Sequence, residues 1–343
     1  MFISEFDYHL PSELIAQKPL PERDAARMMV LRRGEKEIVH SRFEDFPSFL
    51  DPGDVLVLND SKVIPAKVWG KRGPAQIEFL FLGEKEPGLW EVLCRPAKKA
   101  RRGDRISFAP GLEAEVVATA ERGNRVLRFG SAGVGAQLKK IGYAPLPPYI
   151  KRRKSETDLR DFDRERYQTV FARREGSIAA PTAGLHFTPR ILDGVEKKGV
   201  RVHKITLEVG RATFEPVRVQ RIEDHPMRDE RFTVGPKAAR AVNQARAEGR
   251  PVVAVGTTVV RTLESAWNEG RLRVGTRSTA LFIYPGYRFR VVDRLLTNFH
   301  LPRSTLLMLV TAFAGVDLIR KAYAEAVREK YRFYSYGDCM LII

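Results

Sequence analysis

Two histidines lie in loops whose neighbours suit them for acid–base chemistry. His186 lies in APTAGLHFTPR (180–190), where small or turn-forming residues precede it, and His300 lies in TNFHLPRS (297–304). Histidine is the usual general base because its pKa lies near the working pH. Two other interpretations stay open. His186 fits equally well as a buried residue that only completes the core, and Asn298 with His300 would satisfy backbone groups of a stiff loop.

A strand that runs into a helix, VVAVGTTVVRTLESAWNEG (252–270), is the clearest pattern for binding a ligand. Thr257 or Thr258 can cap the helix, whose N-terminus offers free backbone N–H groups. In α/β proteins, ligands bind at the carboxyl ends of strands. The alternative is an ordinary capped helix in which Arg261 pairs with Glu264 one turn away.

Positive charge dominates the sequence, since 59 Lys and Arg against 42 Asp and Glu give a net charge of +17. Such an excess indicates a polyanionic partner, with nucleic acid first, although solubility or a basic proteome would also explain it. Two basic runs are able to form one face that grips a phosphate backbone, and solvated surface charge is the alternative. These runs are Lys98, Lys99, Arg101 and Arg102, and Lys151, Arg152, Arg153 and Lys154.

Metal chemistry and membrane insertion are both disfavoured. None of the six histidines lies three or four residues from another, and Cys94 and Cys339 are far apart, so no metal site is expected. Two isolated cysteines and an N-terminus without a signal peptide favour the cytoplasm. The apolar run 306–316 is too short to cross a bilayer.

The order of strands and helices predicts a layered α/β main domain interrupted by an inserted small β-barrel domain. Closely spaced short strands within 62–148 indicate the barrel, or a sandwich, and strand–helix alternation elsewhere assigns 1–61 and 149–343 to the α/β domain. A proline-rich stretch at 144–154 would link the two. The expected helices are 12–17, 189–198 capped by Thr188, 236–248, 258–268, 304–314 capped by Ser304, and 316–330. The expected strands are 28–32, 37–40, 55–58, 76–82, 89–95, 104–109, 113–120, 125–130, 200–209 and 251–255.

Several long sequence segments, which together extend over nearly the whole chain, resemble a known family in the same order. They are residues 6–31, 52–70, 145–150, 165–172, 180–188, 253–265, 281–315 and 331–342. Together they resemble the S-adenosylmethionine:tRNA ribosyltransferase-isomerase family of queuosine biosynthesis, which also implies an α/β domain with an inserted barrel.

The resemblance implies a specific reaction. The ribosyl part of S-adenosylmethionine, the co-substrate, is transferred to 7-aminomethyl-7-deazaguanine at the wobble position of a tRNA and isomerised. Epoxyqueuosine forms, and adenine and methionine are released. No metal is implied. The expected partner is the anticodon stem-loop of the tRNA, and the protein is expected to act as a cytoplasmic monomer.

A general base that removes a proton from the 5′ carbon beside the sulfonium would start this reaction. His186 is the first choice, and His300 and His225 are the others in matching phrases. The expected substrate-binding residues are Thr182, Gly184, Thr257, Thr258, Arg261, Glu264, Asn298 and Glu230. Of these, Arg261 and Thr258 would hold the methionine carboxylate.

One departure from the family concerns residues 208–214, which read EVGRATF where relatives usually have His-Val-Gly-x-Gly-Thr-Phe. Glu208 must then substitute for that histidine, or the role lies elsewhere. Glu208, Glu230 and Glu264 are also the carboxylates expected to counter the cationic substrates, unless each is half of a surface pair. Two other functions stay open. They are a non-catalytic RNA-binding protein on the same scaffold, and an S-adenosylmethionine-dependent transferase that acts on a small molecule.

Overall fold

The computed structural model describes residues 1–120, 123–130, 133–152, 159–210, 217 and 219–343. The chain folds into two compact units. The α/β unit comprises Met1–Lys62, Pro147–Lys151 and Gln168–Ile343, and the barrel unit comprises Val63–Leu146 and Arg152–Tyr167. The expected class, an α/β domain interrupted by a β-barrel, is confirmed. The barrel unit also takes Arg152–Tyr167, a segment that the expected bounds assigned to the α/β domain.

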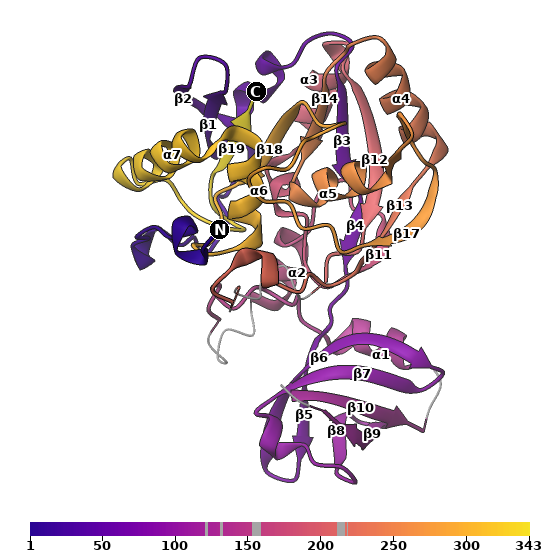
Figure 1. Cartoon of the computed structure of the whole chain (residues 1–343). Helices are drawn as coiled ribbons and strands as arrows, with labels where there is room; N and C mark the ends of the chain where they lie inside the picture. Colours follow the sequence, from indigo (N-terminus) through magenta and orange to yellow (C-terminus); the bar gives the residue numbers. More distant parts are fainter. Residues whose placement is uncertain (121–122, 131–132, 153–158, 211–216, 218) are drawn as a thin grey trace. The chain divides into compact units, whose positions relative to one another are not determined.

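A nine-stranded sheet forms the centre of the α/β unit, in the order β17-β13-β12-β3-β14-β18-β19-β1-β2 (Figure 1). Four adjacent strands are parallel, so their carboxyl ends meet at one edge. They are β12 (Arg201–Leu207), β3 (Val55–Asn59), β14 (Val252–Val255) and β18 (Arg294–Asn298). VLVLN and VVAV are buried at every position, because both faces of the sheet are covered.

The outer strands complete this sheet. β19 pairs in parallel with β1, while the remaining outer pairs are antiparallel. Their bounds are β1 (Arg27–Arg32), β2 (Glu37–Arg42), β13 (Glu230–Val234), β17 (Gly275–Thr279) and β19 (Cys339–Ile342). Two short two-stranded pairs also form, β4 (Ser61–Val63) with β11 (Arg174–Ser177) and β15 (Trp267–Asn268) with β16 (Arg271–Leu272).

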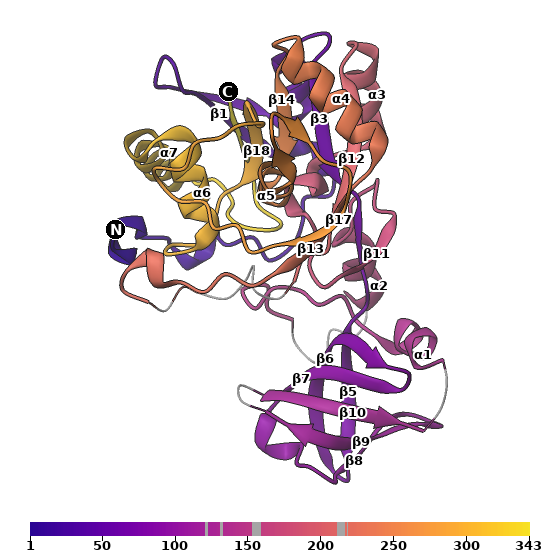
Figure 2. The ribbon, with the colours of Figure 1, turned by 45° about the vertical axis from the view of Figure 1, so that its right-hand side comes forward.

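Helices cover both faces of the sheet and bury a separate core on each. Val55 and Val57 of β3 face the core that also contains residues of α4 to α7, while Leu56 and Leu58 face the core that contains residues of α3. Figures 1 and 2 both show α6 and α7 side by side. The bounds are α3 (Pro189–Lys197), α4 (Pro236–Ala247), α5 (Thr257–Ala266), α6 (Thr305–Ala314) and α7 (Val316–Arg328).

Two predicted helix caps, Thr188 and Ser304, are confirmed, whereas the cap expected at Thr257 or Thr258 is wrong because α5 begins after Gly256 with no side-chain cap. One predicted helix is also wrong. Thr188 Oγ1 accepts a hydrogen bond from the Ile191 N–H, and Ser304 Oγ accepts one from the Leu307 N–H. The helix expected at 12–17 is only one 3₁₀ turn, Ser12–Leu14. The chain leaves the turn because Ile15 forms a β-bridge with Phe333. No helix in the described part of the chain is long and apolar enough to cross a membrane.

Six antiparallel strands close into the barrel in the order β10-β7-β6-β5-β8-β9. Alternate residues of β6, Ile77, Phe79 and Phe81, are buried in its core. Gly70 makes this packing possible, because a Cβ there would lie only 2.6 Å from Ile106 Cγ2. The strands are β5 (Lys67–Arg72), β6 (Ala75–Glu86), β7 (Leu89–Arg95), β8 (Arg105–Ala109), β9 (Leu112–Thr119) and β10 (Asn124–Phe129). The unit also contains two helices that were not predicted, α1 (Val134–Ile141) and α2 (Leu159–Arg166).

Helix α5 is buried on its polar side as well as on its apolar stripe. The Glu264 side chain is fully buried, and its carboxylate accepts hydrogen bonds from the backbone N–H groups of residues 290–292 and from the Tyr287 hydroxyl. Arg261 pairs with Glu230 instead of with Glu264. The alternative of an Arg261–Glu264 pair on a solvated face is therefore wrong, because the segment after β17 covers this side of the helix.

Replacement of Glu264 by Ala tests this role. The variant leaves the N–H groups of residues 290–292 without their acceptor, so we expect the free energy of unfolding to fall by about 3–5 kcal/mol. Urea unfolding followed by circular dichroism measures the change. The control is Glu269→Ala, whose side chain is 74% exposed and should shift stability by less than about 0.5 kcal/mol. Equal stabilities of the two variants would contradict the assignment.

Candidate functional site

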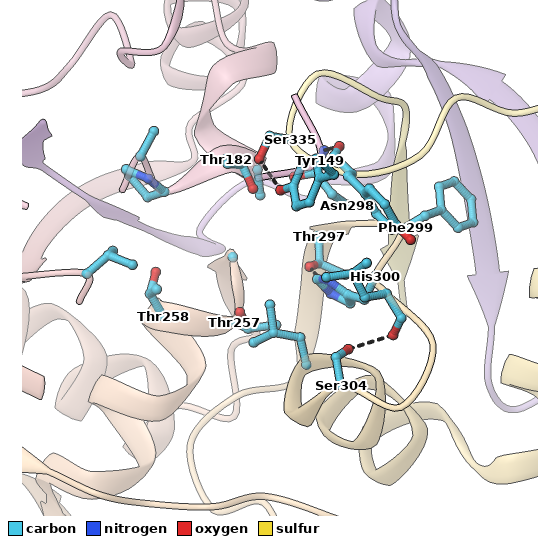
Figure 3. Close-up of a pocket in the computed structure, with 18 residues that line it drawn as sticks. Tyr149, Thr182, Thr257, Thr258, Thr297, Asn298, Phe299, His300, Ser304 and Ser335 are labelled. Carbon is cyan, nitrogen blue, oxygen red and sulfur yellow. Dashed lines mark hydrogen bonds between the residues drawn. The ribbon is translucent and has the colours of Figure 1, made fainter. Parts of the chain in front are cut away.

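A cavity lies at the carboxyl edge of the parallel strands (Figure 3). Its wall includes residues 180–183, 256–258 and 297–301. The segments PTAGLH, GTTVVR and TNFH, which contain several of the candidate residues, therefore meet at one cavity. Topology explains the position. The chain leaves β3 toward β12 on one side, and β14 lies on the other side of β3, so the strand order reverses at this point.

The start of α5 forms one wall of the cavity. Gly256 has a φ of +90°, which favours glycine, and no side chain caps the helix. Thr257 and Thr258 both line the cavity (Figure 3). Asn59, at the end of β3, donates to Thr258 Oγ1 at 3.4 Å and accepts from the Leu207 N–H at 3.0 Å. The helix N-terminus, with its positive dipole end, therefore faces the cavity.

Asn298 separates His186 from the cavity. Its Nδ2 donates to the backbone carbonyls of Tyr334 and Asp338 at 3.2 and 3.3 Å, which identifies the nitrogen because carbonyls only accept. The same Nδ2 lies 3.1 Å from His186 Nε2. Asn298 lines the cavity and its buried Oδ1 has no hydrogen-bond partner in the described structure, as expected of an atom that meets a polar ligand.

His186 is therefore held behind the cavity wall. It is buried, and burial lowers the pKa of its imidazole to about 4, so the ring is neutral near pH 7. In that form Nε2 shares the two Asn298 amide N–H groups with the Tyr334 and Asp338 carbonyls. A protonated ring would place an N–H against an N–H.

His300 lines the cavity directly. Its Nε2 lies 2.9 Å from Thr297 Oγ1 (Figure 3), and burial lowers its pKa to about 3. The backbone of His300 is held on both sides, because its N–H donates to the Tyr323 hydroxyl and its carbonyl accepts from the Tyr8 hydroxyl. The ring is therefore neutral near pH 7 and is held at the cavity wall.

Three aromatic and polar residues of the cavity were not predicted. Tyr149, Tyr334 and Ser335 line it, with the Tyr149 hydroxyl 2.7 Å from Ser335 Oγ and the two tyrosine rings 4.6 Å apart. Tyr149 comes from the proline-rich stretch that was expected to be only a linker. All three lie in sequence segments that carry the family resemblance. That resemblance was the signal in the sequence that could have identified them.

Of the remaining residues expected to bind substrate, Thr182 lines the cavity, whereas Gly184 does not. A Cβ at Gly184 would lie 2.7 Å from Phe171 Cζ, so this glycine permits close packing. Glu208 lies against Gly176 and lines neither this cavity nor the next.

His225, Arg261 and Glu230 line a second cavity, and none of them lines the first. Glu264, buried under the 287–292 segment, lines neither cavity. Among the described residues, no group of three His, Cys, Asp or Glu side chains is arranged to hold a metal ion.

The two basic runs differ in their surroundings. Lys98, Lys99, Arg101 and Arg102 are exposed, and three of them line a hollow on the barrel unit. Arg152, in contrast, forms two 2.8 Å hydrogen bonds with the Asp163 carboxylate. Lys151 is exposed, and Arg153 and Lys154 lie outside the described residues.

Known proteins resemble this chain over its whole length. Residues 3–342 match the family described as queuosine biosynthesis protein. The S-adenosylmethionine:tRNA ribosyltransferase-isomerases of Halothermothrix orenii and Moorella thermoacetica are 49% and 51% identical, each over 100% of both chains. Among solved structures, S-adenosylmethionine tRNA ribosyltransferase from Thermotoga maritima is 40% identical with a TM-score of 0.57, and the match covers 99% of this chain and 100% of that one. The resemblance seen in the sequence is thereby confirmed, and the chain belongs to the queuosine biosynthesis protein family.

Proposed function

We propose that this protein is an S-adenosylmethionine:tRNA ribosyltransferase-isomerase and that the cavity beside α5 binds its S-adenosylmethionine. It transfers and isomerises the ribosyl moiety onto 7-aminomethyl-7-deazaguanine at the tRNA wobble position, with release of adenine and methionine. The observation that carries the assignment of the site is the meeting of the three family-matching segments at one cavity. We also propose that the enzyme acts as a cytoplasmic monomer without a metal.

The walls of the cavity suit the parts of S-adenosylmethionine. The N-terminus of α5, with no side-chain cap, is a site for the methionine carboxylate. Arg261, the residue expected there from the sequence, is instead paired with Glu230. Among the described residues of the wall there is no Asp or Glu. The sulfonium charge would therefore be met by the rings of Tyr149 and Tyr334 and by Asn298 Oδ1.

His300 is the residue we propose as the general base, in place of His186. Among the described residues of the wall it is the only His, Asp, Glu or Lys. If Nε2–H donates to Thr297 Oγ1, Nδ1 carries the lone pair that takes a proton from the 5′ carbon. The adjacent sulfonium stabilises the resulting carbanion, and ring opening and loss of adenine follow.

His300→Gln tests the proposed base. We expect kcat for adenine release to fall about 10²–10⁴-fold, because a positioned general base contributes this much. Chromatography of a mixture with S-adenosylmethionine and tRNA that carries the aminomethyl base measures the released adenine. His186→Gln should lose less activity, since His186 contacts Asn298 rather than the cavity. Near-normal turnover of His300→Gln would remove it as the base. A wild-type protein that binds both substrates without releasing adenine would support the non-catalytic alternative.

The pH dependence of kcat/KM gives a second test of the base. Burial lowers the pKa of His300 to about 3, so the imidazole is already deprotonated at neutral pH and loses its function only near that low value. We therefore expect no acid limb near the ordinary histidine pKa of 6.5. An acid limb near that value in the wild type that disappears in a residually active His300→Gln enzyme would contradict this expectation.

A tRNA-binding role for the barrel unit is the second part of the proposal. Arg125 donates from Nε to the Ala100 carbonyl and from Nη2 to the Ala97 carbonyl, at 2.7 and 2.8 Å. These bonds fix the loop after β7 that carries the four exposed cations Lys98, Lys99, Arg101 and Arg102. A fixed cluster of exposed cations around a hollow fits a phosphate backbone, which gives affinity without sequence choice.

Replacement of all four cations by Ala is expected to weaken tRNA binding and to leave kcat at saturating tRNA unchanged. The slope of log Kd against log salt should fall by about 0.9 for each phosphate that the variant no longer neutralises. The matched control removes four exposed cations from α4 and α7, namely Lys237, Arg240, Arg320 and Lys321. Equal slopes for the two variants would show that only net charge matters, and the barrel site would be rejected.

A further inference from the structure

A second cavity adjoins the first, and Leu306 lines both. Its walls are mainly apolar, with Phe282, Ile283 and Leu309 among them. Its polar groups include Glu230 and Arg261, whose side chains are only 4% and 7% exposed and form an ion pair. An apolar slot with a few convergent polar groups is the usual form of a site for a small planar group.

The Glu230–Arg261 pair offers both acceptors and donors to such a group. Arg261 Nε donates to the Leu281 carbonyl at 3.0 Å and Nη2 to the Thr279 carbonyl at 3.3 Å, while Nη1 pairs with Glu230. These three bonds hold the guanidinium in place and use three of its five N–H groups. The Gly210 N–H donates to Glu230 Oε1 at 3.0 Å, which orients the carboxylate. A carboxylate beside a guanidinium complements the Watson–Crick edge of a guanine-type base, which carries two donors and one acceptor.

An aromatic residue is present to contact the face of such a base. Phe282 is half-buried and lines the cavity, with His225 edge-on at 5.6 Å and Tyr284 at 5.1 Å between ring centroids. Enzymes that act on a base of a nucleic acid commonly take it out of the stack, hold it between aromatic or apolar side chains and read its edge with hydrogen bonds.

We propose that this second cavity binds the acceptor base, a 7-substituted 7-deazaguanine turned out of the RNA. Phe282 stacks against the base, and Glu230 and Arg261 read its Watson–Crick edge. The inference rests on the proposed function, because a transferase must hold its acceptor next to its donor. The shared wall residue Leu306 gives that adjacency. The inference adds the acceptor site and the residues that select a guanine-type base.

Phe282→Ala is the variant that tests this site. Loss of a stacked aromatic typically weakens the binding of one base about 5- to 100-fold, so KM for an anticodon stem-loop RNA that carries the aminomethyl base should rise by this factor. The Kd for S-adenosylmethionine, measured by calorimetry without RNA, should be unchanged. The matched control is Phe289→Ala. Phe289 is half-buried on the same segment, packs on Phe313 and Tyr287, and lines neither cavity.

Glu230→Gln tests whether Glu230 binds the Watson–Crick edge of the base, although it also alters the buried Glu230–Arg261 ion pair. The amide presents donors where the base also presents donors, so KM for the stem-loop should rise more than the Kd for S-adenosylmethionine. If the wild type releases adenine and Phe282→Ala has the same KM for RNA as Phe289→Ala, the acceptor site is wrong and the proposed function stands. If the wild type releases no adenine, the proposed function fails, and this inference fails with it.

Discussion

The parallel alignment of four buried strands is the constraint on which the site depends. Because β12, β3, β14 and β18 run in one direction, the residues that follow them are brought to one edge. Asn59, at the end of β3, forms hydrogen bonds with the Leu207 backbone at the end of β12 and with Thr258 Oγ1 just after β14. It also accepts a hydrogen bond from the Ser61 N–H. Gly256 then lets the chain turn from β14 directly into α5. The cavity is thus a consequence of strand direction, and hydrogen bonds behind its wall help to fix its shape.

The distribution of charge explains how a strongly basic protein could bind cationic substrates as well as a polyanion. A protein of net charge +17 must accept a sulfonium and an ammonium as well as a polyanion. In the barrel unit, Lys98, Lys99, Arg101 and Arg102 are exposed and suit the polyanion. In the α/β unit, the described wall of the first cavity has no Lys or Arg. The second cavity is lined by Arg261, which is paired with Glu230, and by Arg228. The proposed sulfonium site in the first cavity would therefore present neutral dipoles and aromatic rings rather than positive charge.

Local sequence signals predicted many of the elements but missed α1, α2 and several strands of the large sheet, and long-range packing decided the roles of many side chains. The caps at Thr188 and Ser304 depend on neighbours within three residues, so the sequence was sufficient to find them. The periodicity of α5 identified its apolar stripe correctly. It did not reveal that Glu264 is also buried, because the covering residues 287–292 are more than twenty positions away. Tyr149 was missed for the same reason, since it reaches the cavity from a proline-rich stretch far from Ser335.

The boundary between the two cavities is held more rigidly than an ordinary loop. Leu306 lies in the first turn of α6, directly after a cap in which Ser304 Oγ accepts from the Leu307 N–H and donates to the Leu301 carbonyl. Pro302 restricts Leu301, so the approach to the helix is also stiff. A side chain on a capped helix can separate two ligands and still keep them adjacent. The same short segment that presents His300 to the first cavity therefore also sets the distance to the second, which would couple the position of the proposed base to that of the proposed acceptor.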